Sequence, residues 1–244
     1  MKKNHFVLAA LLVVASVMSA AAQKFEGTIR WKLNYDMATF LKSEAMKESM
    51  QQASQMFGGA DMNNPQMVQM IQGMLPQGFD MKIKEGNTLL KVKGGMQAMM
   101  GGGDVLYRKD KKQSYVVDYA QKMYKEIKDE DDAAGAKAKV SKTSETATIA
   151  GHKCTKYVVE TSVEGTKFAQ HIWTTTDIKD IDKDIIKQMN AGQEKASIFF
   201  EGMKGVPLKV AIPELGVGME VTELVREKLN SADFVIPSDF RKRD

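Results

Sequence analysis

Apolar and polar residues alternate along residues 25–35, where the odd positions are mostly apolar or aromatic and the even positions polar. Successive side chains of a β-strand point to opposite faces, so this alternation predicts a long strand with one buried face. Further strand-like runs separated by turn residues predict a largely antiparallel arrangement. These runs lie at residues 79–84, 88–93, 105–108, 114–118, 123–127, 147–149, 154–161, 168–174, 196–203, 206–212 and 217–226.

The apolar spacing changes to a helical period in a few places. Residues 38–56 carry apolar side chains at helical intervals without Gly or Pro, and a shorter stripe follows over residues 67–75 until Pro76. A third stripe begins after Asp177 and ends near residue 190. Strands combined with a few helices indicate an α+β fold, in which a large curved antiparallel sheet, a half-barrel, packs against the helices.

The first 22 residues have the three parts of an export signal. Lys2 and Lys3 precede an apolar run over residues 6–18, and residues 19–22 are small, as signal peptidase requires. We therefore expect cleavage after Ala22 and a periplasmic or secreted protein. The apolar run is shorter than the ~20 residues that span a bilayer. Cys154 is the only Cys, so neither a membrane anchor nor a lipid anchor is expected.

Residues 23–244 are expected to form one domain with a Met-rich helical segment at residues 37–76. Residues 129–143 begin with four acids and contain almost no large apolar residue, which predicts an exposed, flexible linker. The chain has 35 Lys and Arg against 31 Asp and Glu, and two of the Lys lie in the expected signal. This balance gives no support for nucleic-acid binding.

Methionine is concentrated in the first half of the chain, where twelve of the 18 lie between Met37 and Met100. Met is flexible and polarisable and suits surfaces that accept varied apolar shapes. Three interpretations stay open: helices that line a groove for an apolar ligand, binding of Cu(I) by soft thioether sulfur, or ordinary core filling. Residues 67–70 and 96–100 have usable Met spacing, although the stretch lacks the His that copper-handling segments commonly add.

Cys154, with His152 and His171, is the single indication of a nucleophilic site. His152 and Cys154 are two residues apart and would share one face of a strand. A Cys–His site also needs an orienting group and an oxyanion hole, and the sequence indicates neither. We therefore expect a buried, unreactive Cys154 and a protein that is not an enzyme and has no cofactor or metal.

Four short motifs resemble a family of exported bacterial proteins known as domain of unknown function 4412. The motifs are IAGHKCTKY at residues 149–157, IWTTTD at 172–177, GVPLK at 205–209 and FVIP at 234–237. The resemblance implies a lipoprotein-carrier-like fold, with an apolar cavity between sheet and helices that holds acyl chains. It implies no catalytic residues, and the Met-rich segment is its least typical part.

The sequence thus favours a non-catalytic periplasmic binding protein that holds a lipid, another lipophilic ligand or a lipidated protein between sheet and helices. The alternative is an envelope structural or protein-interaction module with a filled core. A continuous apolar cavity would distinguish the carrier from the module. Apolar spacing alone points to the ligand-contacting residues Phe40, Met46, Met50, Met67, Met70 and Met74.

Overall fold

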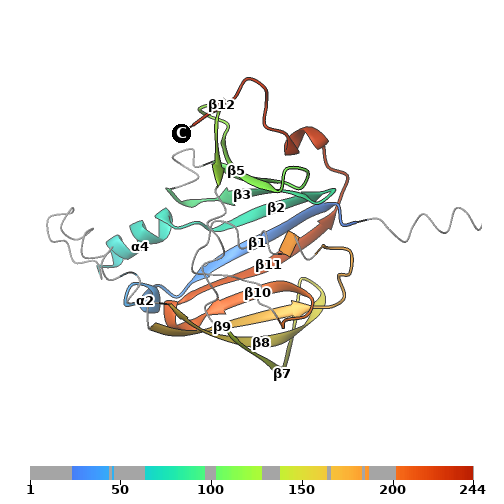
Figure 1. Cartoon of the computed structure of the whole chain (residues 1–244). Coiled ribbons are helices and arrows are strands. Elements are labelled where there is room, and N and C mark those ends of the chain that lie inside the picture. Colours follow the sequence, from blue (N-terminus) through green and yellow to red (C-terminus); the bar gives the residue numbers. More distant parts are fainter. Residues whose placement is uncertain are drawn as a thin grey trace, which may run out of the picture.

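The computed structural model describes residues 24–43, 46, 64–96, 103–127, 138–163, 166–182, 185–186 and 202–243. Twelve strands in these ranges form one open sheet (Figure 1) in the order β12-β6-β5-β4-β3-β2-β1-β11-β10-β9-β8-β7. The strands are β1 (Gly27–Tyr35), β2 (Gly78–Lys84), β3 (Asn87–Lys93), β4 (Asp104–Arg108), β5 (Gln113–Asp118), β6 (Met123–Ile127), β7 (Lys139–Ile149), β8 (His152–Val163), β9 (Thr166–Thr175), β10 (Val206–Ile212), β11 (Val217–Arg226) and β12 (Arg241–Lys242).

The first strand and the penultimate strand, β1 and β11, pair in the middle of the sheet. β1 pairs antiparallel with β2 on one side and with β11 on the other. It therefore joins a meander of β2 to β6 to a second meander of β7 to β11. All described pairings are antiparallel except that of β12, which runs parallel to β6.

The expected α+β half-barrel packed against helices is wrong. The sheet is open, and the described helices of α type are short: α2 (Met37–Phe40) and α4 (Pro65–Met74). Both lie at the end of the sheet where β1 ends and β2 begins (Figure 1). α4 buries none of its residues, so it does not cover the centre of the sheet. The short 3-10 helices are η2 (Pro213–Leu215) and η3 (Ser231–Phe234).

One apolar cluster lies at the middle of the sheet. Ile29 is opposite Met81 in register, and Trp31 is opposite Phe79 and stacks on it with ring centroids 5.6 Å apart. The isoleucines after β9 are buried in the same cluster: Ile178, Ile181, Ile185 and Ile186. Residues 177–182, which we predicted to be helical, have no helix. Ile178 and Ile181 pack against the sheet from irregular backbone, whereas Ile185 and Ile186 are helical, and Ile186 N–H donates to the carbonyl of Asp182 at 3.3 Å.

A second cluster lies on the opposite face, over β3 to β6. Leu89 is opposite Lys82 and Leu106, whereas the core residue Met81 is opposite Leu90. Leu89 and Met81 therefore point to opposite faces. The segment after β11 passes over the β2–β6 half and ends at β12 (Figure 1). It contributes the buried side chains of Leu229 and Phe234 to this second cluster. The two halves of the open sheet are thus covered by different segments.

Several sequence predictions can be compared directly with the described residues. The predicted strands at residues 25–35, 79–127 and 206–226 are confirmed. Residues 139–143 belong to β7 rather than to the predicted linker, because they pair with β8. The export signal, the rest of the linker, most of the first predicted helix and the predicted strand at 196–201 lie outside the described residues. Within the described part, no helix is long and apolar enough to span a membrane.

Candidate functional site

The first predicted ligand residues lie just after β1. Asp36 caps α2 by accepting hydrogen bonds from the backbone N–H groups of Ala38 (3.1 Å) and Thr39 (3.4 Å). Phe40 at the end of α2 is buried, with its ring edge-on to Tyr35 at 5.6 Å. Phe40 is therefore a packing residue of this corner. Met46 is half-buried, and Met50 lies outside the described residues.

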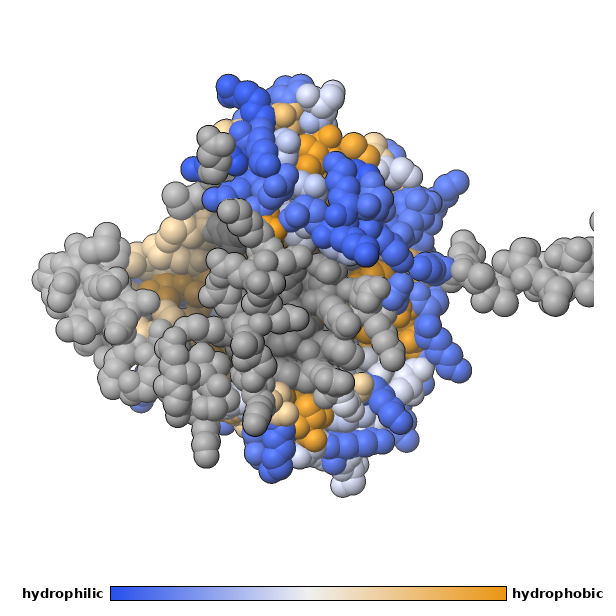
Figure 2. Space-filling view, viewed as in Figure 1, coloured by the Kyte–Doolittle hydropathy of each residue, from blue (hydrophilic) through white to orange (hydrophobic). Residues whose placement is uncertain are grey.

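The other predicted residues lie on α4. Asn64 caps the helix by accepting a hydrogen bond from Gln66 N–H at 2.9 Å, and Pro65 occupies the first turn, where its missing N–H costs nothing. Met67 and Met70 are half-buried and Met74 is 38% exposed. The side of α4 that faces the viewer in Figure 2 carries the tan and orange of apolar residues. Among the described residues, α4 thus presents a Met stripe that is half-buried at Met67 and Met70 and exposed at Met74.

A cleft of about 390 Å³ separates the end of β1 from the connection between α4 and β2. Two hydrogen bonds hold this connection: Tyr35 Oη donates to the carbonyl of Pro76 and Leu33 N–H to that of Gln77, both at 2.9 Å. None of the six predicted residues is among the described lining. The lining consists of Lys32, Leu33, Asn34, Tyr35, Gln72, Leu75, Pro76 and Gln77.

The sequence analysis placed Leu33 and Tyr35 on the buried face of β1 but did not identify them as site residues. β2 begins at Gly78, opposite Lys32, so β1 continues beyond its partner. The overhang leaves Leu33 and Tyr35 half-buried. The sequence contained one indication of this overhang: the alternation of apolar and polar residues is longer over residues 25–35 than over residues 79–84.

An apolar row runs from this cleft across one face of the sheet. Leu33 is opposite Met219, Met219 is opposite Val210, and that row continues through Ile172 to Tyr157. Val210, Ile172 and Tyr157 are buried, whereas Leu33 and Met219 are only half-buried. The apolar surface left accessible is therefore concentrated at the α4 end of the row.

Lys32 is the charged residue in the described lining of the cleft. Glu220 lies opposite Lys32 in register but is paired with Lys209 at 2.7 Å. Within the described residues Lys32 forms no ion pair. Lys32 shares a face of the sheet with Glu220 and Lys209, whereas its neighbour Leu33 shares the other face with Met219.

A second depression, of about 480 Å³, lies over β10 and β11. The small residues Ala211 and Gly218, opposite each other in register, lie among its lining. The ion pair of Lys209 and Glu220 also lines it, together with apolar residues such as Ile212 and Val217. It differs from the cleft at α4 in that Lys209 and Glu220 are already paired with each other.

The structure does not bring the Cys–His residues together. Cys154 is buried, its Sγ approaches the carbonyl oxygen of His152 at 3.5 Å, and burial raises its pKa to about 11. His171 is opposite Val158 and packs edge-on against Trp173 at 6.2 Å. Four strand residues separate His171 from the position opposite Cys154, about 13 Å at 3.3 Å per residue. A protonated, buried thiol at that distance from the imidazole is not an activated nucleophile.

No group of three or more His, Cys, Asp and Glu side chains with the arrangement of a metal site occurs in the described part of the chain. His, Cys, Asp and Glu are the side chains that bind hard and borderline metal ions. Thioether sulfur of Met is a separate class of ligand.

The chain was compared with known proteins. The comparisons with curated proteins and with solved structures give no match, so no solved structure supports the lipoprotein-carrier fold implied by the resemblance. A family described as Domain of unknown function (DUF4412) matches residues 79–240. The matched region begins at Phe79 in β2, includes all later strands through β11, and excludes β1 and α4, so the cleft lies at its N-terminal border. Because the match covers most of the sequence, the chain belongs to the DUF4412 family.

Proposed function

We propose that this protein is a non-catalytic binding protein for a single-chain amphiphile with an anionic head. The ligand is held at the α4 end of the sheet, with its head at Lys32 and its chain along Leu33 and the stripe of α4. The observation that carries the proposal is the cleft beside a helix whose apolar side is not buried.

Three properties of the cleft support this proposal. Its volume lies within the range of about 300–1,000 Å³ typical of small-molecule sites. The chain carries no charged residue between Asp61 and Asp80, so an acyl chain beside α4 would not desolvate a charge. Lys32 is the charged residue of the described lining, and its ammonium group can pair with a carboxylate or phosphate. Export to the periplasm, expected from the N-terminus, would bring the protein to a lipid-rich envelope.

The test uses native mass spectrometry and titration of the purified chain with palmitate and with hexadecanol. The two probes share a hydrocarbon chain, and palmitate alone carries a charge. Lys32→Gln should weaken palmitate about two- to fivefold, the effect of an exposed ion pair, and leave hexadecanol unchanged. Leu33→Glu and Leu75→Glu should abolish binding of both probes.

Lys125→Gln on β6 serves as the matched control, because Lys125 is an exposed Lys away from the cleft. Each variant is accepted only if its melting temperature stays close to that of the parent. Absence of binding for both probes, or equal binding by the parent and both Leu→Glu variants, would overturn the proposal.

The alternative is an envelope structural or protein-interaction module. The observation in its favour is β7, an 11-residue strand at the edge of the sheet, paired with β8 alone in the described residues. Such an edge can accept a strand of another chain. A partner that protects the amides of β7 from hydrogen exchange, together with no response to either lipid probe, would favour the module.

A further inference from the structure

Three methionines of α4 lie on one side of the helix. At about 100° per residue, Met67, Met70 and Met74 project within a sector of about 60°. Neighbours three and four residues apart on a helix have Cβ atoms about 5–6 Å apart. Met67 and Met74 are about 10.5 Å apart along the helix axis, too far to share one ion. Met70 and Met74 are about one turn apart, and the three rotatable bonds of Met let their sulfur atoms converge. Gln69 and Gln72 lie on the other side of the helix and are exposed.

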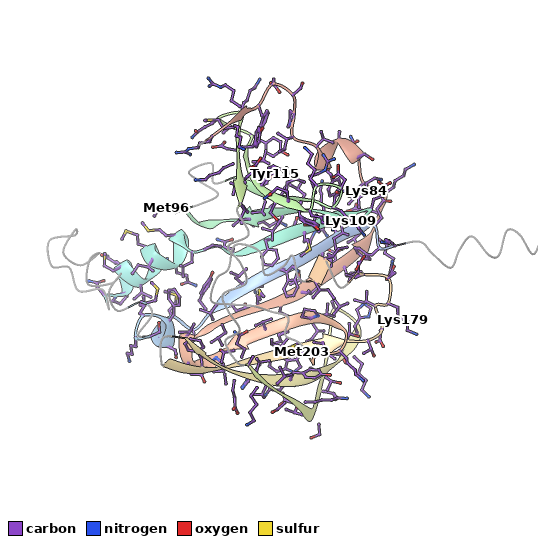
Figure 3. All side chains as sticks on the ribbon, in the orientation of Figure 1. Lys84, Met96, Lys109, Tyr115, Lys179 and Met203 are labelled. Atoms are coloured by element: carbon purple, nitrogen blue, oxygen red, sulfur yellow. The ribbon has the colours of Figure 1, made fainter. Side chains whose placement is uncertain are left out.

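A fourth methionine, Met96, follows β3 and lies beside α4. Gly95 has a φ of +75°, and a Cβ there would be 2.7 Å from the backbone of Leu75 and Pro76. This close approach of two backbones places Met96 next to the end of α4, as Figure 3 shows. Gly95 permits the approach because it has no side chain.

Exposure of these methionines is unusual for this molecule. The exposed large apolar residues of the described part are Met74 (38%), Met96 (44%), Tyr119 and Val235. Two of the four are thus methionines at the same corner. Burying a large apolar side chain is worth about 1.5–3 kcal/mol, and Met81 on β2, at 2% exposure, shows that the fold buries Met elsewhere.

The chemistry of the corner selects a soft metal ion. Thioether sulfur is a soft ligand that favours Cu(I), whereas carboxylates favour Mg²⁺ and Ca²⁺. Residues 62–79 contain no Asp, Glu, Lys, Arg or His, so no carboxylate or imidazole of this stretch competes with the thioether sulfur.

We propose that Met70, Met74 and Met96 form a thioether site for Cu(I). Met70 and Met74 of α4 supply two sulfur ligands, and Met96 supplies the third. No oxidation or reduction is part of the proposal: the ion is bound and released as Cu(I). The site goes beyond the proposed lipid binding and does not depend on it.

The test is an anaerobic titration with Cu(I) under reductant, in competition with bicinchoninate, and a parallel titration with Ag(I), a soft ion that does not change oxidation state. The parent should bind one ion per chain. Met70→Leu and Met74→Leu should each weaken binding at least about tenfold, since even changes outside the ligand shell can weaken metal affinity that much. X-ray absorption of the copper complex should show sulfur ligands only.

The matched control is Met81→Leu, the same exchange at a buried Met outside the site. It should bind copper as the parent does. The proposal is overturned if the parent holds no copper against bicinchoninate, if a variant with Met70, Met74 and Met96 changed to Leu binds as well as the parent, or if nitrogen or oxygen ligands dominate.

The same variants separate this proposal from the lipid-binding one. Leu keeps the apolar character of Met and removes its sulfur, so Met→Leu variants should lose copper and keep palmitate. Leu33→Glu should lose palmitate and keep copper.

Discussion

Lys84 donates a hydrogen bond from Nζ to Oε1 of Glu26 at 2.7 Å, and the side chain of Lys84 is only 10% exposed. The same ammonium group donates to the carbonyl of Leu229 at 3.0 Å, and Glu26 Oε1 accepts from the N–H of Leu229 at 2.7 Å. Lys84 lies at the end of β2, in the region that the C-terminal segment approaches (Figure 3). The pair therefore fastens the start of that segment, residues 227–243, to the sheet.

Acid should loosen this C-terminal segment. The hydrogen bond from Lys84, followed by that from Leu229, lowers the pKa of Glu26 from its ordinary value of 4.5. A folded pKa below the unfolded one means that the stabilisation is present above pH 4.5 and is lost as the pH falls through the folded value. Hydrogen exchange, corrected for intrinsic rates, should show protection of residues 229–243 falling below pH 4.5.

Glu26→Gln should lower this protection already at neutral pH and remove the part of the acid response that depends on Glu26. The control is Glu223→Gln, which removes the partner of Arg30 on the exposed surface instead. An unchanged acid response in Glu26→Gln would contradict the assignment.

The thiol of Cys154 should be unreactive in the folded protein. It is fully buried and its pKa is raised to about 11 by burial, so thiolate is scarce at pH 8. Ellman's reagent should therefore label Cys154 only at the rate of unfolding, and rapidly in denaturant. Cys154→Ser should lower the free energy of unfolding by about 1–3 kcal/mol, because a hydroxyl replaces an apolar group. Rapid labelling without denaturant would contradict the prediction.

Two lysines flank Trp173 from the neighbouring strands. Lys156 and Lys209 lie opposite Trp173 in register, with Nζ atoms 5.1 and 5.3 Å from the ring centroid. We expect a coupling energy of about 0.5–1 kcal/mol between Lys209 and the ring, as for other cation–π pairs near a surface. A double-mutant cycle with Lys209→Met and Trp173→Leu measures it. A coupling indistinguishable from zero would contradict the contribution.

Two glycines with similar backbone angles should respond differently to Ala. Gly205 has a φ of +92° and a Cβ there would lie 2.2 Å from the carbonyl oxygen of Thr175, whereas Gly151 has a φ of +81° and open space around it. Gly151→Ala should cost about 1–2 kcal/mol, the strain of a left-handed residue. Gly205→Ala should cost more, since a clash with backbone adds to that strain. Urea unfolding of both variants checks the order, and equal costs would contradict it.

The sequence was most informative where the signal is local. Alternation with period two depends only on the strand itself, so β1 and the meander of β2 to β6 were predicted well. The helix at α4 was likewise predicted, because Asn64, Pro65 and Pro76 mark its ends. Cys154 was correctly expected to be buried, as a lone Cys in a strand usually is.

The helical period was misleading for Ile178 and Ile181, because the same spacing also buries isoleucines of irregular backbone against a sheet, whereas Ile185 is helical as predicted. The predicted linker extended too far towards the C-terminus. Its last residues, which are only weakly apolar, form a strand because they pair with β8. For the candidate site, periodicity selected the methionines but not Leu33, Tyr35 or Lys32. Those three gather at the cleft only because β1 overhangs β2.

By itself, the sequence determined the strands, the ends of α4 and the Met stripe, since each depends on neighbours within a few residues. The tertiary structure decided that β1 pairs with β11, that two different segments cover the two halves of the sheet, and that α4 stands at its end. These outcomes depend on contacts between residues far apart in the chain, which no local period encodes. The same contacts leave the methionines of α4 outside the core.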